Sequence, residues 1–195
     1  MTTNNPTAVA TTAATKLEKS MSKSSLDEFV QSARRSLLIV DCSGSMGECI
    51  RSGGTKIQAL RKVVASLRET HPVPVAAFGH RTRGRDVVEV VDTIPEPAGG
   101  TPLHEAIRFG RVNEANHLVV VTDGCADSES HAFAEARAFG GPIDVFYIGD
   151  GNDRGARFAQ ELAQMTGGTA NLTDLGKPKE LSGKIALLLG DGSSL

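Results

Sequence analysis

The sequence predicts an α/β fold: a doubly wound, mostly parallel sheet with one antiparallel edge strand and helices on both faces. Two observations lead to this class. Short aliphatic runs alternate along the chain with longer segments of helical periodicity, which is typical of strand–helix units joined by right-handed crossovers. The chain has no Trp, one Tyr and seven Phe, so we expect an aliphatic, alanine-rich core, as in helix-covered parallel sheets.

The first half of the chain supplies three strands and one helix. A strand is predicted at residues 36–40, where four consecutive aliphatic residues suit a position covered on both faces. Residues 56–68 form a helix, since their apolar positions recur with a period of 3.6, and a second strand is expected at 73–78. The strand at 87–91 comes too soon for a crossover helix, so it should pair antiparallel at the sheet edge.

The second half continues the alternation. Thr101 and Pro102 are predicted to be the N-cap and first residue of a helix that runs to about residue 110. Gly140 and Gly141 stop the helix that follows it. The remaining predicted elements are a strand at 118–122, a helix at 128–139, a strand at 143–148, a helix at 153–165, a strand at 169–172 and a helix at 180–189.

The two ends of the chain differ in composition from its middle. Residues 1–33 are predicted to be a flexible N-terminal arm, because Thr, Ala and Asn dominate its start. Scattered apolar positions at 17–32 would allow a short helix within this arm. Residues 34–190 are predicted to form a single domain, and residues 191–195 a C-terminal tail.

Composition limits the partners and the compartment. The 195 residues suit one domain, and 21 basic residues nearly balance 23 acidic ones, so neither nucleic acid nor a membrane surface is expected as a direct ligand. No apolar run approaches the ~20 residues that span a bilayer, and residues 1–14 lack the pattern of a secretory signal. The three cysteines match no zinc or redox spacing, which favours a reduced, cytoplasmic protein.

A loop rich in small oxygen-bearing side chains follows the first strand. Asp41, Ser43 and Ser45 alternate there, and Gly44 and Gly47 allow a turn tight enough for their oxygens to converge. Convergent hard oxygens suit Mg²⁺ or Mn²⁺ and not a soft metal. The alternatives are that the serines only cap the loop or the next helix, and that Asp41 only binds backbone N–H groups.

The segment Asp41–Ser45 resembles the Asp-x-Ser-x-Ser signature of von Willebrand factor A (vWA) domains, the metal-ion-dependent adhesion site. Gly99–Leu103 resembles the threonine loop of that family, and Val119–Gly124 its aspartate at the end of an apolar strand. The resemblance implies that both serines bind the metal directly and that the aspartate of the first strand acts through water. The implied metal site consists of Asp41, Ser43, Ser45, Thr101 and Asp123.

The resemblance also implies where this site lies. In the fold of that family, the strands ending at Asp41 and Asp123 are neighbours where the strand order reverses, and ligands bind such sheets there. Two of the implied site residues also have an alternative role without metal. Thr101 could serve only as the N-cap of its helix, and Asp123 could serve only to form an Asx-turn. Cys42 and Cys125 flank the aspartates, and packing of small thiols beneath the loop explains them better than zinc or redox chemistry.

Two classes of function follow. The leading hypothesis is an interaction module, not an enzyme, that binds one divalent metal and captures a Glu or Asp of a partner protein. The resemblance implies an adaptor in a larger assembly, with a separate AAA+ ATPase chain as one candidate partner. The alternative is a metal-dependent phosphohydrolase with Asp41 as nucleophile. That chemistry favours a second acidic residue where this chain has Ser43, and no Ser-His-Asp arrangement is evident in the sequence.

Overall fold

The longest aliphatic runs of the sequence form the centre of the sheet. A computed structural model describes residues 35–50, 53–71, 73–82, 84–173 and 175–190. Within them, six strands lie in the order β3-β2-β1-β4-β5-β6, and every neighbouring pair is parallel except β2 with β3. The strands are β1 (Ser36–Asp41), β2 (Val75–Thr82), β3 (Arg85–Val90), β4 (His117–Thr122), β5 (Ile143–Tyr147) and β6 (Ala170–Leu172).

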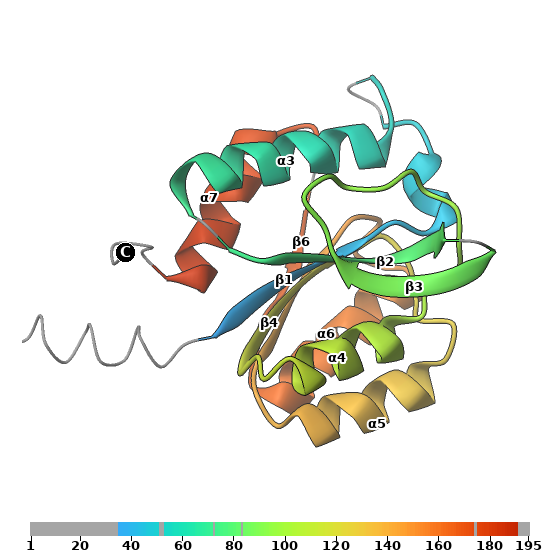
Figure 1. Ribbon diagram of the computed structural model, residues 1–195, viewed down its shortest axis with the longest axis vertical. Helices are drawn as coiled ribbons and strands as arrows, with labels where there is room; N and C mark the ends of the chain where they lie inside the picture. Colours follow the sequence, from blue (N-terminus) through green and yellow to red (C-terminus); the bar gives the residue numbers. More distant parts are fainter. Residues whose placement is uncertain (1–34, 51–52, 72, 83, 174, 191–195) are drawn as a thin grey trace, which may run out of the picture. The chain divides into compact units, whose positions relative to one another are not determined.

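Helices cover both faces of this sheet. Figure 1 shows α3 and α7 on one face and α4, α5 and α6 on the other. A short 3₁₀ helix, η1, follows β1 directly. The helical elements are η1 (Gly44–Gly47), α3 (Lys56–Thr70), α4 (Leu103–Val112), α5 (Glu129–Phe139), α6 (Arg154–Thr166) and α7 (Pro178–Leu189).

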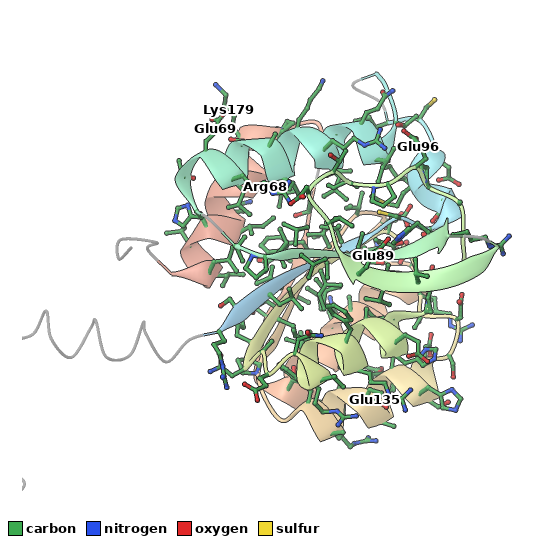
Figure 2. The ribbon with its side chains drawn as sticks, in the orientation of Figure 1. Arg68, Glu69, Glu89, Glu96, Glu135 and Lys179 are labelled. Carbon is green, nitrogen blue, oxygen red and sulfur yellow. The ribbon has the colours of Figure 1, made fainter. Side chains whose placement is uncertain are left out.

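The burial of both faces explains why the central strands are aliphatic throughout. Successive side chains of a strand point to opposite faces, so the aliphatic run of β1 supplies two cores. Leu38 and Val40 belong to the cluster with α3 and α7, whereas Leu37 and Ile39 belong to the cluster with α4, α5 and α6. Side chains fill the space between the sheet and both helical layers (Figure 2).

Local signals set most helix ends. Thr55 forms a capping box at the start of α3, and the side chains of Ser128 and Asp153 cap α5 and α6. Gly140 and Gly167 end α5 and α6 in the left-handed region, where glycine is favoured. These caps satisfy backbone groups that a helix end would otherwise leave without partners.

The predicted fold class is confirmed, and several predicted bounds shift by a few residues. Strand β2 runs to Thr82 instead of residue 78, because its pairing with β3 continues to Thr82 and Arg85. Helix α7 begins at Pro178, two residues before its predicted start at residue 180, because proline is well suited to the first helical turn. Helix α4 begins at Leu103 and not at Pro102.

The described residues all belong to one compact unit. The predicted arm at 1–33, its possible helix at 17–32 and the predicted tail at 191–195 lie outside the described residues, and the domain bounds 34–190 stay a prediction. In the described part of the chain, every helix is too short or too polar to cross a membrane.

Candidate metal centre

The loops that follow β1 and β4 meet at one point of the sheet. The two strands are parallel neighbours, so their carboxyl ends lie at the same edge. The strand order reverses between them, which is where doubly wound sheets bind ligands. The structure brings the predicted residues together at this point, where they are linked directly or through adjoining loops: Asp41, Ser43, Ser45, Thr101 and Asp123.

Asp41 is fully buried beneath the loop that follows β1 and holds this loop in place through hydrogen bonds. Its Oδ1 accepts a hydrogen bond from the Ser43 amide at 2.7 Å, and its Oδ2 accepts one from the Thr122 hydroxyl at 2.6 Å. Burial raises the pKa of Asp41 to about 6, although the bonds from Thr122 and Ser43 act in the opposite direction. Asp41 therefore ties the loop after β1 to the end of β4.

The hydroxyls of Ser43 and Ser45 point toward the loop that follows β4. Ser43 Oγ lies 3.1 Å from Ser45 Oγ, which donates to Asp123 Oδ1 at 2.8 Å. Ser43 occupies the N-cap position of η1 but makes no side-chain capping bond. The hydroxyls thus form a line of oxygens ending at a carboxylate, and the first of them does not serve as a helix cap.

Thr101 is not the N-cap of α4, so that prediction is wrong. The N-cap position belongs to Pro102, and no side chain caps this helix. The backbone of Thr101 is instead paired with Asp127: its N–H donates to Asp127 Oδ1 at 2.9 Å, and its carbonyl accepts from the Asp127 amide at 2.9 Å. This pairing holds Thr101 outside the helix and leaves its hydroxyl without a capping role.

Close backbone contacts hold the threonine loop against the serine loop. The Gly44 amide donates to the Gly99 carbonyl at 3.0 Å, and the Gly99 amide donates to the Gly79 carbonyl at 2.8 Å. A Cβ built on Gly124 would lie 3.6 Å from Thr101 Oγ1, so the Thr101 hydroxyl also faces the loop of Asp123. Three loops are therefore packed around the oxygens.

Lys56 is the main residue of the site that sequence reasoning missed. Its ammonium donates to Asp123 Oδ2 at 2.7 Å and to Glu48 Oε2 at 2.7 Å. Burial alone would lower the pKa of Lys56, but the bonds to Asp123 and Glu48 outweigh this effect and raise it. A lysine at the first position of a helix was a usable signal, because the helix dipole disfavours a cation there.

Two further residues support the site without having been predicted. Thr122 precedes Asp123 and donates to Asp41, and Asp127 holds the backbone of Thr101. A hydroxyl next to a predicted ligand was a weak signal for Thr122. The sequence contains no comparable signal for Asp127.

The donor set fits a hard divalent cation. Hydroxyl and carboxylate oxygens are suitable ligands for Mg²⁺ and Mn²⁺. The Asp123 carboxylate already binds one positive charge in this site, the ammonium of Lys56. In the part of the chain that the structure describes, no three His, Cys, Asp or Glu side chains are grouped to hold a metal ion. Any site here therefore depends on hydroxyls in addition to carboxylates.

The cysteines beside the site pack as small apolar groups. All three cysteines are free thiols, and Cys42 is fully buried in the core on the α3 side of the sheet. Burial raises the pKa of Cys42 to about 12 and also raises the pKa of Cys125. A raised pKa disfavours the thiolate that metal binding and redox chemistry need.

The fold and the site define a class of protein, a doubly wound α/β domain with hydroxyl and carboxylate side chains at its switch point. The chain belongs to the von Willebrand factor type A domain family, whose profile matches residues 35–172. Domains of this family generally serve as interaction modules.

Solved structures of low sequence identity share the fold. One is an aerotolerance-related membrane protein from Bacteroides fragilis NCTC 9343 with multiple mutations to serines, at 14% identity and a TM-score of 0.55; the match covers 80% of this chain and 98% of that one. Another is proximal thread matrix protein 1 from the mussel byssus, at 15% identity and a TM-score of 0.52, covering 79% and 45%. The comparison with curated protein sequences gives no match.

Proposed function

We propose that the protein is a protein-interaction module that binds Mg²⁺ or Mn²⁺ at a metal-ion-dependent adhesion site. The line of oxygens Ser43 Oγ, Ser45 Oγ and Asp123 Oδ1, at successive distances of 3.1 and 2.8 Å, is the observation that carries this proposal. Thr101 adds a hydroxyl that caps no helix. Asp41 acts from beneath by fixing the serine loop.

The charges of the site favour an acidic partner. Asp41 and Asp123 are the only acidic residues among the five proposed site residues, and the other three are neutral. A divalent ion held there would supply an electrophilic centre for a Glu or Asp of another protein. The serine and threonine hydroxyls orient the site without neutralising it.

This function fits an adaptor within a larger assembly, with a separate AAA+ ATPase chain as one candidate partner. We place the assembly in the cytoplasm, because the three cysteines of the chain are free thiols and a reducing compartment keeps them so.

The geometry does not favour the phosphohydrolase alternative. A nucleophile must reach its substrate, but the Asp41 side chain is fully buried and both of its oxygens accept hydrogen bonds. Assaying phosphatase activity with Mg²⁺ tests this alternative directly.

Calorimetry with Mg²⁺ and Mn²⁺ tests the metal site. The wild type should bind one ion weakly, and Ser43→Ala/Ser45→Ala should bind none. The matched control is Ser66→Ala/Ser182→Ala, a second pair of serines, on α3 and α7, whose hydroxyls lie 3.3 Å from each other; it should bind the ion as the wild type does. Equal binding by the wild type and the Ser43/Ser45 variant would remove the serines from the site.

Affinity capture tests the role of the metal in recognition. Tagged wild type should retain its partner in Mg²⁺ and lose it in excess EDTA, and Ser43→Ala/Ser45→Ala should lose it in both buffers. A complex that survives chelation and the double substitution undiminished would show that another face of the domain binds the partner.

A further inference from the structure

The Asp123 carboxylate is shared between two kinds of group. Its side chain is completely buried, its Oδ1 accepts from the Ser45 hydroxyl, and its Oδ2 accepts from the Lys56 ammonium. A buried carboxylate without a counter-charge would be strongly destabilising. Lys56 therefore neutralises the carboxylate on which the proposed metal site depends.

The backbone of α3 fixes Lys56 beside the site. Lys56 is the first residue of the helix, directly after the Thr55 capping box, and its amide donates to the Glu48 carbonyl at 3.0 Å. Its side chain is only 17% exposed. Because the helix dipole disfavours a cation at this position, the two carboxylates must account for the inward placement of the ammonium.

Glu48 gives the ammonium a second partner nearer to solvent. The Glu48 side chain is 67% exposed, whereas that of Asp123 is fully buried, and both lie 2.7 Å from Lys56 Nζ. The ammonium can therefore give up Asp123 and stay paired with Glu48. The Glu48 carboxylate can therefore hold the Lys56 ammonium once it has left Asp123.

We infer that Lys56 is a tethered cation that competes with the divalent metal for Asp123 and so sets the metal affinity of the site. The inference rests on the proposed metal site and adds a regulatory residue to it. Metal binding exchanges one cation for another at Asp123, with Lys56 moving toward Glu48.

The exchange predicts a preference for divalent ions. A monovalent ion carries no more charge than the ammonium, which is already attached to the chain and needs no capture from solution. A divalent ion interacts about twice as strongly with the same carboxylates. The site should therefore respond to Mg²⁺ and Mn²⁺ and ignore Na⁺ and K⁺.

Substitution of Lys56 tests the competition. Lys56→Gln keeps a donor for Asp123 but removes the charge, so its Mg²⁺ dissociation constant in calorimetry should fall about tenfold, equivalent to about 1.4 kcal/mol. Without metal, the same variant should melt at a lower temperature than the wild type. The control is Lys62→Gln, which removes an exposed lysine from the same helix and should change neither quantity.

The outcomes separate this inference from the proposed function. If the wild type binds Mg²⁺ and Lys56→Gln binds it no more tightly than Lys62→Gln, the competition is overturned and the metal site stands. If neither the wild type nor Lys56→Gln binds metal, both proposals fall. If only Lys56→Gln binds, the competition is supported and the wild-type site is closed by its own lysine.

Amine-reactive labelling of the wild type gives a test that needs no substitution. Mass spectrometry should show Lys56 protected without metal and labelled faster at saturating Mg²⁺, with Lys62 unchanged as the internal reference. Equal labelling of Lys56 in both conditions, in protein that calorimetry shows to be saturated, would overturn the inference even if Lys56→Gln fails to fold.

Discussion

His117 and Asp144 form a buried pair at the amino ends of the strands, far along the sheet from the metal site. His117 Nε2 lies 2.7 Å from Asp144 Oδ2, and its Nδ1 lies 2.9 Å from the Ser36 hydroxyl. Thr169 donates to Asp144 Oδ1 through both its amide and its hydroxyl. No spacing in the sequence indicates this Ser-His-Asp arrangement. Because His117 is only 1% exposed, we interpret the arrangement as a tie between strands.

Asp144→Asn should destabilise the domain by about 2 kcal/mol at neutral pH, the typical effect of losing a hydrogen bond to a charged group. Burial acts to raise the pKa of Asp144, but bonds from His117 and Thr169 outweigh it and lower the pKa. A lowered pKa means that this stabilisation is complete above the unfolded pKa of about 3.9 and disappears as pH falls through the folded pKa.

Urea unfolding of the wild type and Asp144→Asn at pH 7, 5 and 3 measures this effect. The stability difference should persist at pH 5 and shrink at pH 3, which lies below the pKa of this carboxyl in the unfolded chain. A difference that stays constant over this range would contradict the assignment of the stabilisation to the ionised carboxylate.

Gly79 is the residue on which the spacing of the site loops depends. Its φ is +75°, and a Cβ there would lie 2.6 Å from the Gly100 carbonyl oxygen and 2.8 Å from the Ser43 amide nitrogen. Gly79→Ala should cost about 3 kcal/mol, from a strained backbone and overpacking together, and should weaken metal binding.

The matched control for Gly79→Ala is Gly84→Ala. Gly84 has nearly the same φ, +77°, but nothing lies within 4 Å of its added Cβ. Gly84→Ala should cost only about 1 kcal/mol and leave metal binding intact. Thermal melts and calorimetry compare the two variants, and equal losses would show that the contacts of Gly79 are unimportant.

At the scale of the elements, two threonines that precede helices, Thr55 and Thr101, have different roles. Thr55 caps α3, accepting from the Gln58 amide at 3.4 Å, whereas Thr101 precedes α4 without capping it. Thr55→Ala should therefore destabilise the domain by about 1 kcal/mol. Thr101→Ala should cost less stability but weaken Mg²⁺ binding.

Denaturant unfolding and calorimetry on the two variants check this division. If Thr101→Ala loses as much stability as Thr55→Ala and keeps full metal affinity, Thr101 has a purely structural role. That outcome would remove Thr101 from the proposed ligands and leave the other four.

The element scale also shows what sequence reasoning can reach. The aliphatic runs of β1 and β4 and the apolar period of α3 are local signals, so these elements were predicted almost to the residue. The start of α4 was misplaced because Asp127, 26 residues beyond Thr101, holds the backbone there. Lys56 was missed as a site residue because its partner Asp123 is 67 residues away.

At the scale of the whole molecule, metal binding should stabilise the folded state. The ligand oxygens come from separate segments and gather only when the sheet is formed, so the unfolded chain has no equivalent site. A Mg²⁺ concentration of about 100 times the dissociation constant should add about 2.7 kcal/mol to the free energy of unfolding.

Thermal melts with Mg²⁺ and with EDTA at equal ionic strength measure this linkage. The melting temperature of the wild type should rise with Mg²⁺, and that of Ser43→Ala/Ser45→Ala should not. A rise of the same size in both proteins would mean that the ion acts elsewhere on the domain.

The pairing of β1 with β4 has a consequence for biosynthesis. Thr122 follows Asp41 by 81 residues, so roughly 4–16 s separate the two at ~5–20 residues per second on the ribosome. During that interval β1 can pair with β2, but its other edge stays open, and an open aliphatic edge can pair with other chains. The nascent protein is therefore most vulnerable to aggregation before β4 emerges, and β1 is the segment that a molecular chaperone would need to shield.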